Sequence, residues 1–226
     1  MIARPAARPV SSAPGPPSSR PFTVAELAER FGSLPAFRIH QYPAPGTATR
    51  EDAERLRGGG FSCELVDGTL IERAMSQFTS VIAVRIAFFL QRYFEERGGG
   101  FVDLYGGTLQ RAPDAAAVLD EQQPGGPVDS GYAEGAPALC VEVFSRSNTR
   151  PEMERKRREY FENGCRLCWT VFPPTDRRPA TVEVHTPGDG PGDDDGTVLT
   201  LTDTLVGDPV LPGFAVPVAR LFSRAD

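Results

Sequence analysis

The chain contains one lysine, Lys156, among 24 basic residues, so arginine stands at every other basic position. Lysine carries a compact charge whose proton affinity changes with burial, whereas arginine carries a planar and permanently charged fork. Met153 lies three residues before Lys156 and Tyr160 four residues after it, on the same side of a predicted helix. We therefore expect Lys156 to border the buried face of this helix.

Three carboxylates lie in or at the start of predicted strands, where an isolated buried charge would destabilise the fold. Glu142 lies in the middle of an apolar predicted strand, Glu64 lies in the first strand of a predicted hairpin, and Asp114 opens another strand. A buried carboxylate needs a cation or hydrogen-bond donors. If neighbouring strands bring these acids together, they repel one another, and a divalent metal is the strongest partner that keeps them ionised. Ligand sets made of oxygen atoms favour Mg²⁺ or Mn²⁺.

The same four residues also allow a purely structural interpretation. Glu142 and Lys156 would then form one ion pair, and Asp114 and Glu64 would be turn or edge residues. Structural charge networks and catalytic sites perturb charges in similar ways, so the residues alone leave both interpretations open.

The surrounding sequence predicts helices and strands that could position these residues. Capping boxes at Thr23 and Thr149 predict helix starts, and Asp67-Gly68 suits a tight hairpin turn. The predicted helices cover residues 23–31, 50–57, 80–96 and 149–163, and the predicted strands lie in 61–72, 101–105, 114–119, 136–144, 165–172, 181–186 and 197–201. This order indicates an α/β or α+β domain in which the last strands form a β-meander. Residues 211–214 are expected to pack the C-terminal tail onto this domain.

Length and composition indicate the class of protein. At 226 residues, with 40% hydrophobic and 24% charged residues, the chain resembles a soluble globular protein. Residues 1–21 are rich in proline, serine and arginine and are predicted to be a disordered tail, which leaves 22–226 as a single domain. No stretch is long and apolar enough to cross a membrane. The cysteines follow no secretory signal and are expected to be reduced and buried, so the predicted compartment is the cytoplasm.

Six short motifs occur in a recognisable order along the chain. They lie at residues 63–68, 111–114, 141–149, 154–161, 164–169 and 211–214. Together they resemble the Uma family of restriction endonucleases, within the PD-(D/E)XK nuclease superfamily, and the resemblance covers residues 22–223. It implies a restriction-endonuclease-like fold, with a central mixed sheet flanked by helices and a C-terminal β-meander.

The resemblance also implies roles for the residues singled out above. Asp114 and Glu142 would be metal ligands, and Glu64 would be a further acidic member of the catalytic site. The superfamily usually places its catalytic lysine two residues after the strand acid, where this chain has Phe144. Lys156, on the following helix, matches a lysine that has moved to a new position.

The function implied is that of a metal-dependent endonuclease, a hydrolase that cleaves phosphodiester bonds in DNA with Mg²⁺ or Mn²⁺. All four site residues are present, which favours this function. The alternative is a non-catalytic nucleic-acid-binding or assembly protein on a decayed nuclease fold, which the net charge of −6 and the short segment before Asp114 favour. DNA is the expected partner, no membrane is expected, and the sequence is compatible with a homodimer.

Basic residues gather on the predicted helix over 149–163. They could contact a phosphate backbone, or form a solvated face that pairs with glutamates of the same helix. We favour the second interpretation for Arg155 and Arg158. His185 is expected on an edge strand with a surface role.

Overall fold

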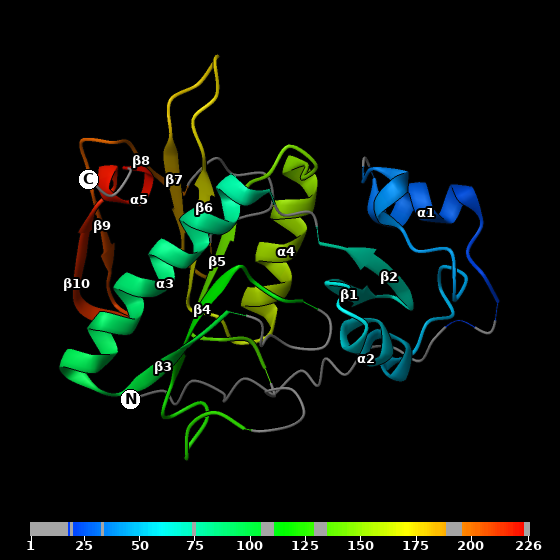
Figure 1. The fold of residues 1–226 in the computed structure, drawn as a ribbon, viewed down its shortest axis with the longest axis horizontal. Helices are drawn as coiled ribbons and strands as arrows, with labels where there is room; N and C mark the ends of the chain where they lie inside the picture. Colours follow the sequence, from blue (N-terminus) through cyan, green and yellow to red (C-terminus); the bar gives the residue numbers. More distant parts are fainter. Residues whose placement is uncertain are drawn as a thin grey trace, which may run out of the picture.

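The computed structural model describes residue 18 and residues 20–32, 34–73, 76–104, 111–128, 135–188 and 196–223. The predicted disordered tail lies almost entirely outside these residues, as does most of the short segment before Asp114. The described part has a central sheet with helices on both faces, and a smaller group of N-terminal elements lies beside it (Figure 1).

The central sheet has six strands in the described residues, in the order β3-β4-β5-β6-β7-β8. β5 and β6 are parallel and the other neighbouring pairs are antiparallel, which confirms the predicted mixed sheet. The last three strands form the expected meander. The bounds are Gly100–Asp103 for β3, Ala115–Leu119 for β4, Leu139–Val143 for β5, Leu167–Phe172 for β6, Thr181–His185 for β7 and Thr197–Leu199 for β8.

β5 runs through the interior of the sheet, and all its residues are buried. Its side chains alternate between the two faces, so Val141 and Val143 belong to the main hydrophobic core while Cys140 packs on the opposite face. Glu142 shares the face of Cys140. A carboxylate is thereby held inside the sheet, on the side away from the main core.

α3 (Gln77–Arg97) covers the face that carries the main core (Figure 1). Its residues Ile82, Ile86 and Leu90 recur every four positions and are buried in the main core, where the helix packs on β3, β4 and β5. The helix begins three residues before its predicted start because the hydroxyl of Ser76 accepts a backbone N–H of the first turn.

α4 (Arg150–Glu162) covers the opposite face and connects the parallel strands β5 and β6. The predicted capping box at Thr149 is confirmed. Tyr160 packs against Cys140 of the sheet. Lys156 is 3% exposed, which confirms that it borders the buried side of the helix.

The N-terminal elements lie beside α4 (Figure 1). They are α1 (Val24–Phe31), the short 3-10 helix η1 (Ala36–Arg38), α2 (Arg50–Gly58), and a hairpin of β1 (Cys63–Val66) and β2 (Thr69–Glu72). The predicted tight turn is confirmed, because Asp67 and Gly68 have φ of 48° and 67°. A buried ion pair between Arg38 Nη2 and Glu152 Oε1, 2.9 Å long, fastens these elements to α4.

The C-terminal segment forms a hairpin that the sequence analysis did not predict. It consists of β9 (Thr204–Gly207) and β10 (Leu211–Pro217), followed by α5 (Ala219–Phe222). Phe214 of β10 packs against Trp169 of β6, with ring centroids 5.5 Å apart. The predicted packing role of 211–214 is confirmed, but these residues pack as part of a strand.

His185 is 3% exposed and lies in β7, which has β8 on its outer side. Its predicted position on an edge strand, with a surface role, is therefore wrong. The four cysteines are free and buried, as expected. Among the described helices, none combines the length and apolar character that a membrane span requires.

Candidate functional site

The structure brings the four predicted site residues together on the side of the sheet that α4 covers. Glu142 projects from β5, Lys156 from α4 and Glu64 from β1, while Asp114 directly precedes β4. Because β4 and β5 are antiparallel, continuing their register by one pair places Asp114 opposite Glu142. All four residues are buried, with at most 8% of their surface exposed.

Lys156 joins acids from two separate sheets. Its Nζ lies 3.2 Å from both carboxylate oxygens of Glu142 and 2.9 Å from Oε1 of Glu64. The Tyr160 hydroxyl, one turn further along α4, donates to Glu142 Oε1 at 2.5 Å. The ion pair of the structural interpretation therefore exists. Glu64 and Asp114, however, are buried members of the same cluster rather than turn or edge residues.

Asp114 has a partner on each oxygen. Oδ1 lies 2.8 Å from Arg73 Nη2, and Oδ2 accepts the backbone N–H of Val143 at 2.8 Å. Arg73 directly follows β2, so this contact ties the hairpin to the central sheet. A metal ion at Oδ1 would compete with the Arg73 guanidinium for this oxygen.

Glu64 is compensated by two cations. Arg111 Nη1 donates to its Oε2 at 2.8 Å, and Arg111 Nε donates to Glu159 of α4. Burial alone would lower the pKa of Arg111, but the Glu64 and Glu159 carboxylates raise it above its usual range. Burial would likewise raise the pKa of Glu64, but Lys156 and Arg111 lower it well below its ordinary value.

The cluster contains equal numbers of acidic and basic side chains, but the cations do not stabilise the ionised form of each acid equally. Its members are the carboxylates Glu64, Asp114 and Glu142 and the cations Arg73, Arg111 and Lys156. Burial raises the pKa of Glu142 to about 7, against the effect of Lys156 and with the help of Asp114. Burial would lower the pKa of Lys156, but Glu142 and Glu64 raise it. Lys156 therefore stays protonated as an ammonium group. Glu142 is the acid whose ionised form a further cation would stabilise most.

The donor chemistry of the cluster fits a hard divalent cation. Every candidate ligand is a carboxylate oxygen, as Mg²⁺ and Mn²⁺ prefer. Glu64 Oε1 contacts Lys156 Nζ but lies outside hydrogen-bond geometry, so this buried oxygen retains binding capacity. Within the described residues no three Asp, Glu, His or Cys side chains are grouped closely enough to hold a metal. Cations lie between the acids, and Arg73 would compete with a metal ion for Asp114.

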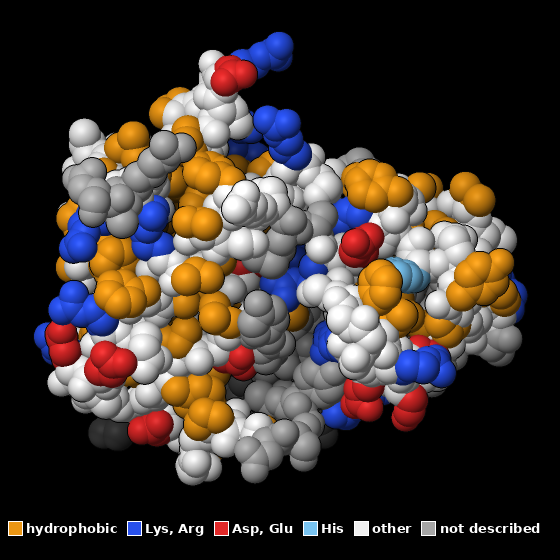
Figure 2. Space-filling model, in the orientation of Figure 1, with side chains coloured by type: hydrophobic (Ala, Val, Ile, Leu, Met, Phe, Trp, Pro, Cys, Tyr) orange, Lys and Arg blue, Asp and Glu red, His pale blue; other side chains and the backbone are white. Residues whose placement is uncertain are grey.

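A cavity of about 270 Å³ adjoins this cluster at Arg73, the member of the cluster that lines it. Arg57 and Arg73 line it, together with Ser62 and Ala112, and the Arg73 guanidinium separates it from Asp114. Figure 2 shows basic side chains at the junction between the sheet with its helices and the N-terminal elements. The cavity therefore offers an anionic ligand a positively charged approach to the buried acids.

Sequence reasoning missed the two arginines of the cluster. Arg111 belongs to a recognised motif but had no predicted role, and Arg73 was not singled out. Charge balance was the available signal, because three buried acids cannot be compensated by Lys156 alone. That signal predicts additional cations but does not say which of the many arginines supply them.

Comparisons with known proteins establish the family and the fold of this chain. The family model Uma2, described as "Putative restriction endonuclease", matches residues 50–219, a range that contains all four predicted site residues. The fold is similar to the crystal structure of "a putative nuclease belonging to DUF820" from Anabaena variabilis ATCC 29413, with a TM-score of 0.61 and 16% sequence identity. That similarity covers 77% of this chain and 97% of the other, and at this identity it concerns the fold alone. A search of curated proteins found no match. The chain therefore belongs to the Uma2 family of "putative restriction endonucleases".

Proposed function

We propose that this protein is a metal-dependent endonuclease that hydrolyses phosphodiester bonds in DNA. The observation that carries the proposal is the convergence of Asp114, Glu142, Glu64 and Lys156 beside a cavity lined by arginines. Acidic side chains repel one another, so their convergence is expected at a site that binds a cation. The arginines suit the approach of a phosphate group.

Asp114 and Glu142 would hold Mg²⁺ or Mn²⁺, and Glu64 would support the ion directly or through water. The bound ion would supply Lewis-acid chemistry, by activating water and by shielding the charge of the phosphate. Because the pKa of Glu142 is about 7, its carboxyl group would release a proton when the ion binds near neutral pH.

Lys156 would act as a hydrogen-bond donor in this reaction. Glu142 and Glu64 raise its pKa, so it remains protonated near neutral pH and cannot serve as a base in the present arrangement. The ammonium group can instead orient a water molecule or stabilise the negative charge that develops on the phosphate. Arg73 would turn from Asp114 toward the phosphate in the cavity.

The alternative remains a non-catalytic nucleic-acid-binding protein on the same fold. One observation favours it, namely that Arg73, Arg111 and Lys156 already balance the three acids, so the cluster is stable without a metal. Both functions use the same basic approach, and only one of them requires a divalent ion.

Cleavage of a supercoiled plasmid in the presence of Mg²⁺ or Mn²⁺ distinguishes the two functions. We expect cleavage by the wild-type protein, and a loss of about 100-fold or more in Glu142→Gln and in Lys156→Arg. Lys156→Arg keeps the charge, but its larger planar fork cannot replace a compact ammonium group.

The matched control is Glu162→Gln, an exposed glutamate of α4, which should cleave at the wild-type rate. Metal-independent cleavage, or full activity of Glu142→Gln, would contradict the proposed role of the acids. Absence of cleavage with retained DNA binding would favour the non-catalytic alternative.

A further inference from the structure

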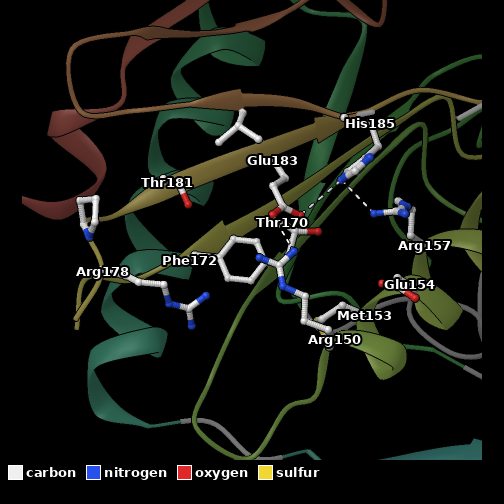
Figure 3. A pocket seen from close by; sticks show the side chains of 13 residues that line it. Arg150, Met153, Glu154, Arg157, Thr170, Phe172, Arg178, Thr181, Glu183 and His185 are labelled. Atoms are coloured by element: carbon white, nitrogen blue, oxygen red, sulfur yellow. Dashed lines mark hydrogen bonds and ion pairs between the residues drawn. The ribbon is translucent and has the colours of Figure 1, made fainter. Parts of the chain in front are cut away.

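A second cavity has a volume of about 340 Å³. Residues of α4, β6, β7 and β8 line it, together with the loop before β7 (Figure 3). Lys156, the neighbour of Arg157 on α4, contacts Glu64 instead. Three arginines line it, Arg150 and Arg157 from α4 and Arg178 from the loop before β7. None of these arginines belongs to the cluster around Glu142.

Arg157 is a buried cation whose side-chain partner is a histidine. It is 9% exposed, and its Nη1 lies 2.9 Å from Nε2 of His185. Because arginine can only donate, the imidazole nitrogen accepts and supplies no negative charge. In the part of the chain that the structure describes, no carboxylate forms an ion pair with Arg157. A buried guanidinium without an anion is costly, so this wall of the cavity attracts one.

The other two arginines lie nearer the opening. Arg150 stacks over the Phe172 ring at 4.6 Å from its centroid, and its Nη1 lies 2.8 Å from Glu183 Oε1. Arg178 is exposed, and its guanidinium extends toward Phe172 and Arg150 in Figure 3. Its side chain has no ion pair within the described ranges. Arg178 is therefore free to engage a ligand.

Charge and hydrogen-bonding groups define the chemistry of a ligand. The three guanidinium groups outnumber the two carboxylates of the lining, Glu154 and Glu183. Thr170 and Thr181 add hydroxyl groups that can donate. Guanidinium groups bind phosphate through paired, charge-assisted hydrogen bonds, and the volume lies within the usual range for small-molecule sites. An isolated phosphate ion would leave most of such a volume unfilled.

We propose that this cavity binds the phosphate group of a nucleotide, held by Arg178, Arg150 and Arg157. The nucleotide is either free or part of a nucleic-acid strand, and both carry the same phosphate chemistry. Thr170, in the floor of the cavity, is the register partner of Glu142 on the adjacent strand. Glu142 and Thr170 are thus about one strand spacing, roughly 5 Å, apart within the sheet. The cavity site does not depend on a metal or on cleavage.

The test uses two neighbouring arginines that differ in their relation to the cavity. Arg178 lines it, whereas the adjacent Arg177, which is also exposed, does not. Calorimetric titration with deoxyadenosine 5′-monophosphate, in the presence of EDTA to keep divalent metals away, measures the site alone. We expect Arg178→Gln to weaken binding by about 10-fold or more, as for a lost charged hydrogen bond, and Arg177→Gln by less than about twofold.

A short single-stranded oligodeoxynucleotide forms the second arm. If the oligonucleotide binds in an Arg178-dependent way and the free nucleotide does not, the phosphate belongs to a nucleic-acid strand; the converse result assigns the site to a free nucleotide. Failure of both probes to bind the wild-type protein, or equal weakening by the two variants, would overturn the proposal. Melting temperatures equal to that of the wild type establish that both variants are folded.

Discussion

Arg73 determines, at the scale of single residues, whether the buried acids can serve a metal. Its guanidinium donates a hydrogen bond to Asp114 Oδ1, and the backbone N–H of Val143 donates one to Oδ2. The guanidinium also borders the cavity through which a phosphate would enter. One side chain therefore competes with a cation for the acid and is placed to contact the substrate.

Replacing Arg73 should separate these two effects. We expect Arg73→Gln to bind Mn²⁺ about 10-fold more tightly than the wild type, because it removes a competing cation worth at least about 1.4 kcal/mol. The metal-free variant should be less stable by about 3–5 kcal/mol, since Asp114 is left buried and unpaired, and Mn²⁺ should restore much of this stability. Calorimetry and thermal melting measure the two quantities.

The control is Arg57→Gln, which removes a charge from the same cavity without touching Asp114. Its Mn²⁺ affinity should stay near that of the wild type. Weaker Mn²⁺ binding by Arg73→Gln would show that this arginine helps to hold the site together for the metal rather than competing with it.

Glu142 gives the protein a pH dependence with a defined sign. Its pKa is raised from 4.5 to about 7, so within this window the folded protein retains a proton that the unfolded chain has released. Stability should therefore fall as pH rises through the window, by up to about 3 kcal/mol once Glu142 is ionised. We expect the urea midpoint of the metal-free protein to fall between pH of about 5 and about 8, with a smaller fall in Glu142→Gln. The same slope in both proteins would assign the dependence to other groups.

α4 is the element that organises the candidate site. Two adjacent residues of this helix contact different sites. Lys156 contacts Glu142 and Glu64, while Arg157 lines the second cavity. The N-terminal elements reach the helix through Arg38, which bonds both oxygens of Glu152 and the carbonyl oxygen of Glu72. The position of the hairpin, and with it of Glu64, depends on this contact.

A double-mutant cycle measures how strongly Arg38 attaches the N-terminal elements to α4. Arg38→Met removes the cation that faces the largely buried Glu152 side chain, which keeps only the donors Asn148 and Thr149, and should cost about 3 kcal/mol of the free energy of unfolding. Adding Glu152→Gln removes the unpaired charge and should recover part of this loss, because glutamine can still complete the capping box at Thr149. Urea unfolding gives each value.

An exposed ion pair provides the comparison for this cycle. Arg92 and Glu96 form a surface pair on α3, and Arg92→Ala should change the free energy of unfolding by less than about 1 kcal/mol. A loss of the same small size in Arg38→Met would mean that the N-terminal elements are held mainly by other contacts.

The whole molecule carries a net charge of −6, yet arginines line both of the cavities described above. One cavity is lined in part by α4 and the other by residues of the N-terminal elements with Arg73 and Ala112, and arginine side chains line both. A low net charge limits indiscriminate binding to nucleic acid, while local positive potential directs anions to particular places. The distribution of charge is thus more informative about function than its sum.

Local signals made most of the fold predictable from the sequence. The cap at Thr149 and the turn at Asp67-Gly68 involve residues a few positions apart, so the sequence displays them directly. The hairpin of β9 and β10 was missed because its register shifts between Leu211 and Ala215, which interrupts regular alternation.

The candidate site was predictable only in part. Acids within apolar strands and a lone lysine are visible in the sequence, and the four residues do lie together. Arg73 and Arg111 contact acids that are 41 and 47 residues away in the chain. Hydrophobic periodicity reports only local structure, so it cannot predict contacts between residues so far apart in the chain. Arginine stands at nearly every basic position, so composition does not distinguish Arg73 and Arg111 from the other arginines.

The parallel pair β5 and β6, with α4 between them, has a consequence for the order in which the molecule assembles. Glu142 and Lys156 are 14 residues apart, so closing the loop between them costs less chain entropy than joining Arg73 to Asp114 or Arg111 to Glu64. We expect the β5–α4–β6 segment to form early, with the hairpin docking onto it later. During folding, Lys156 would meet Glu142 first and Glu64 last, so the complete charge cluster would mark the end of folding.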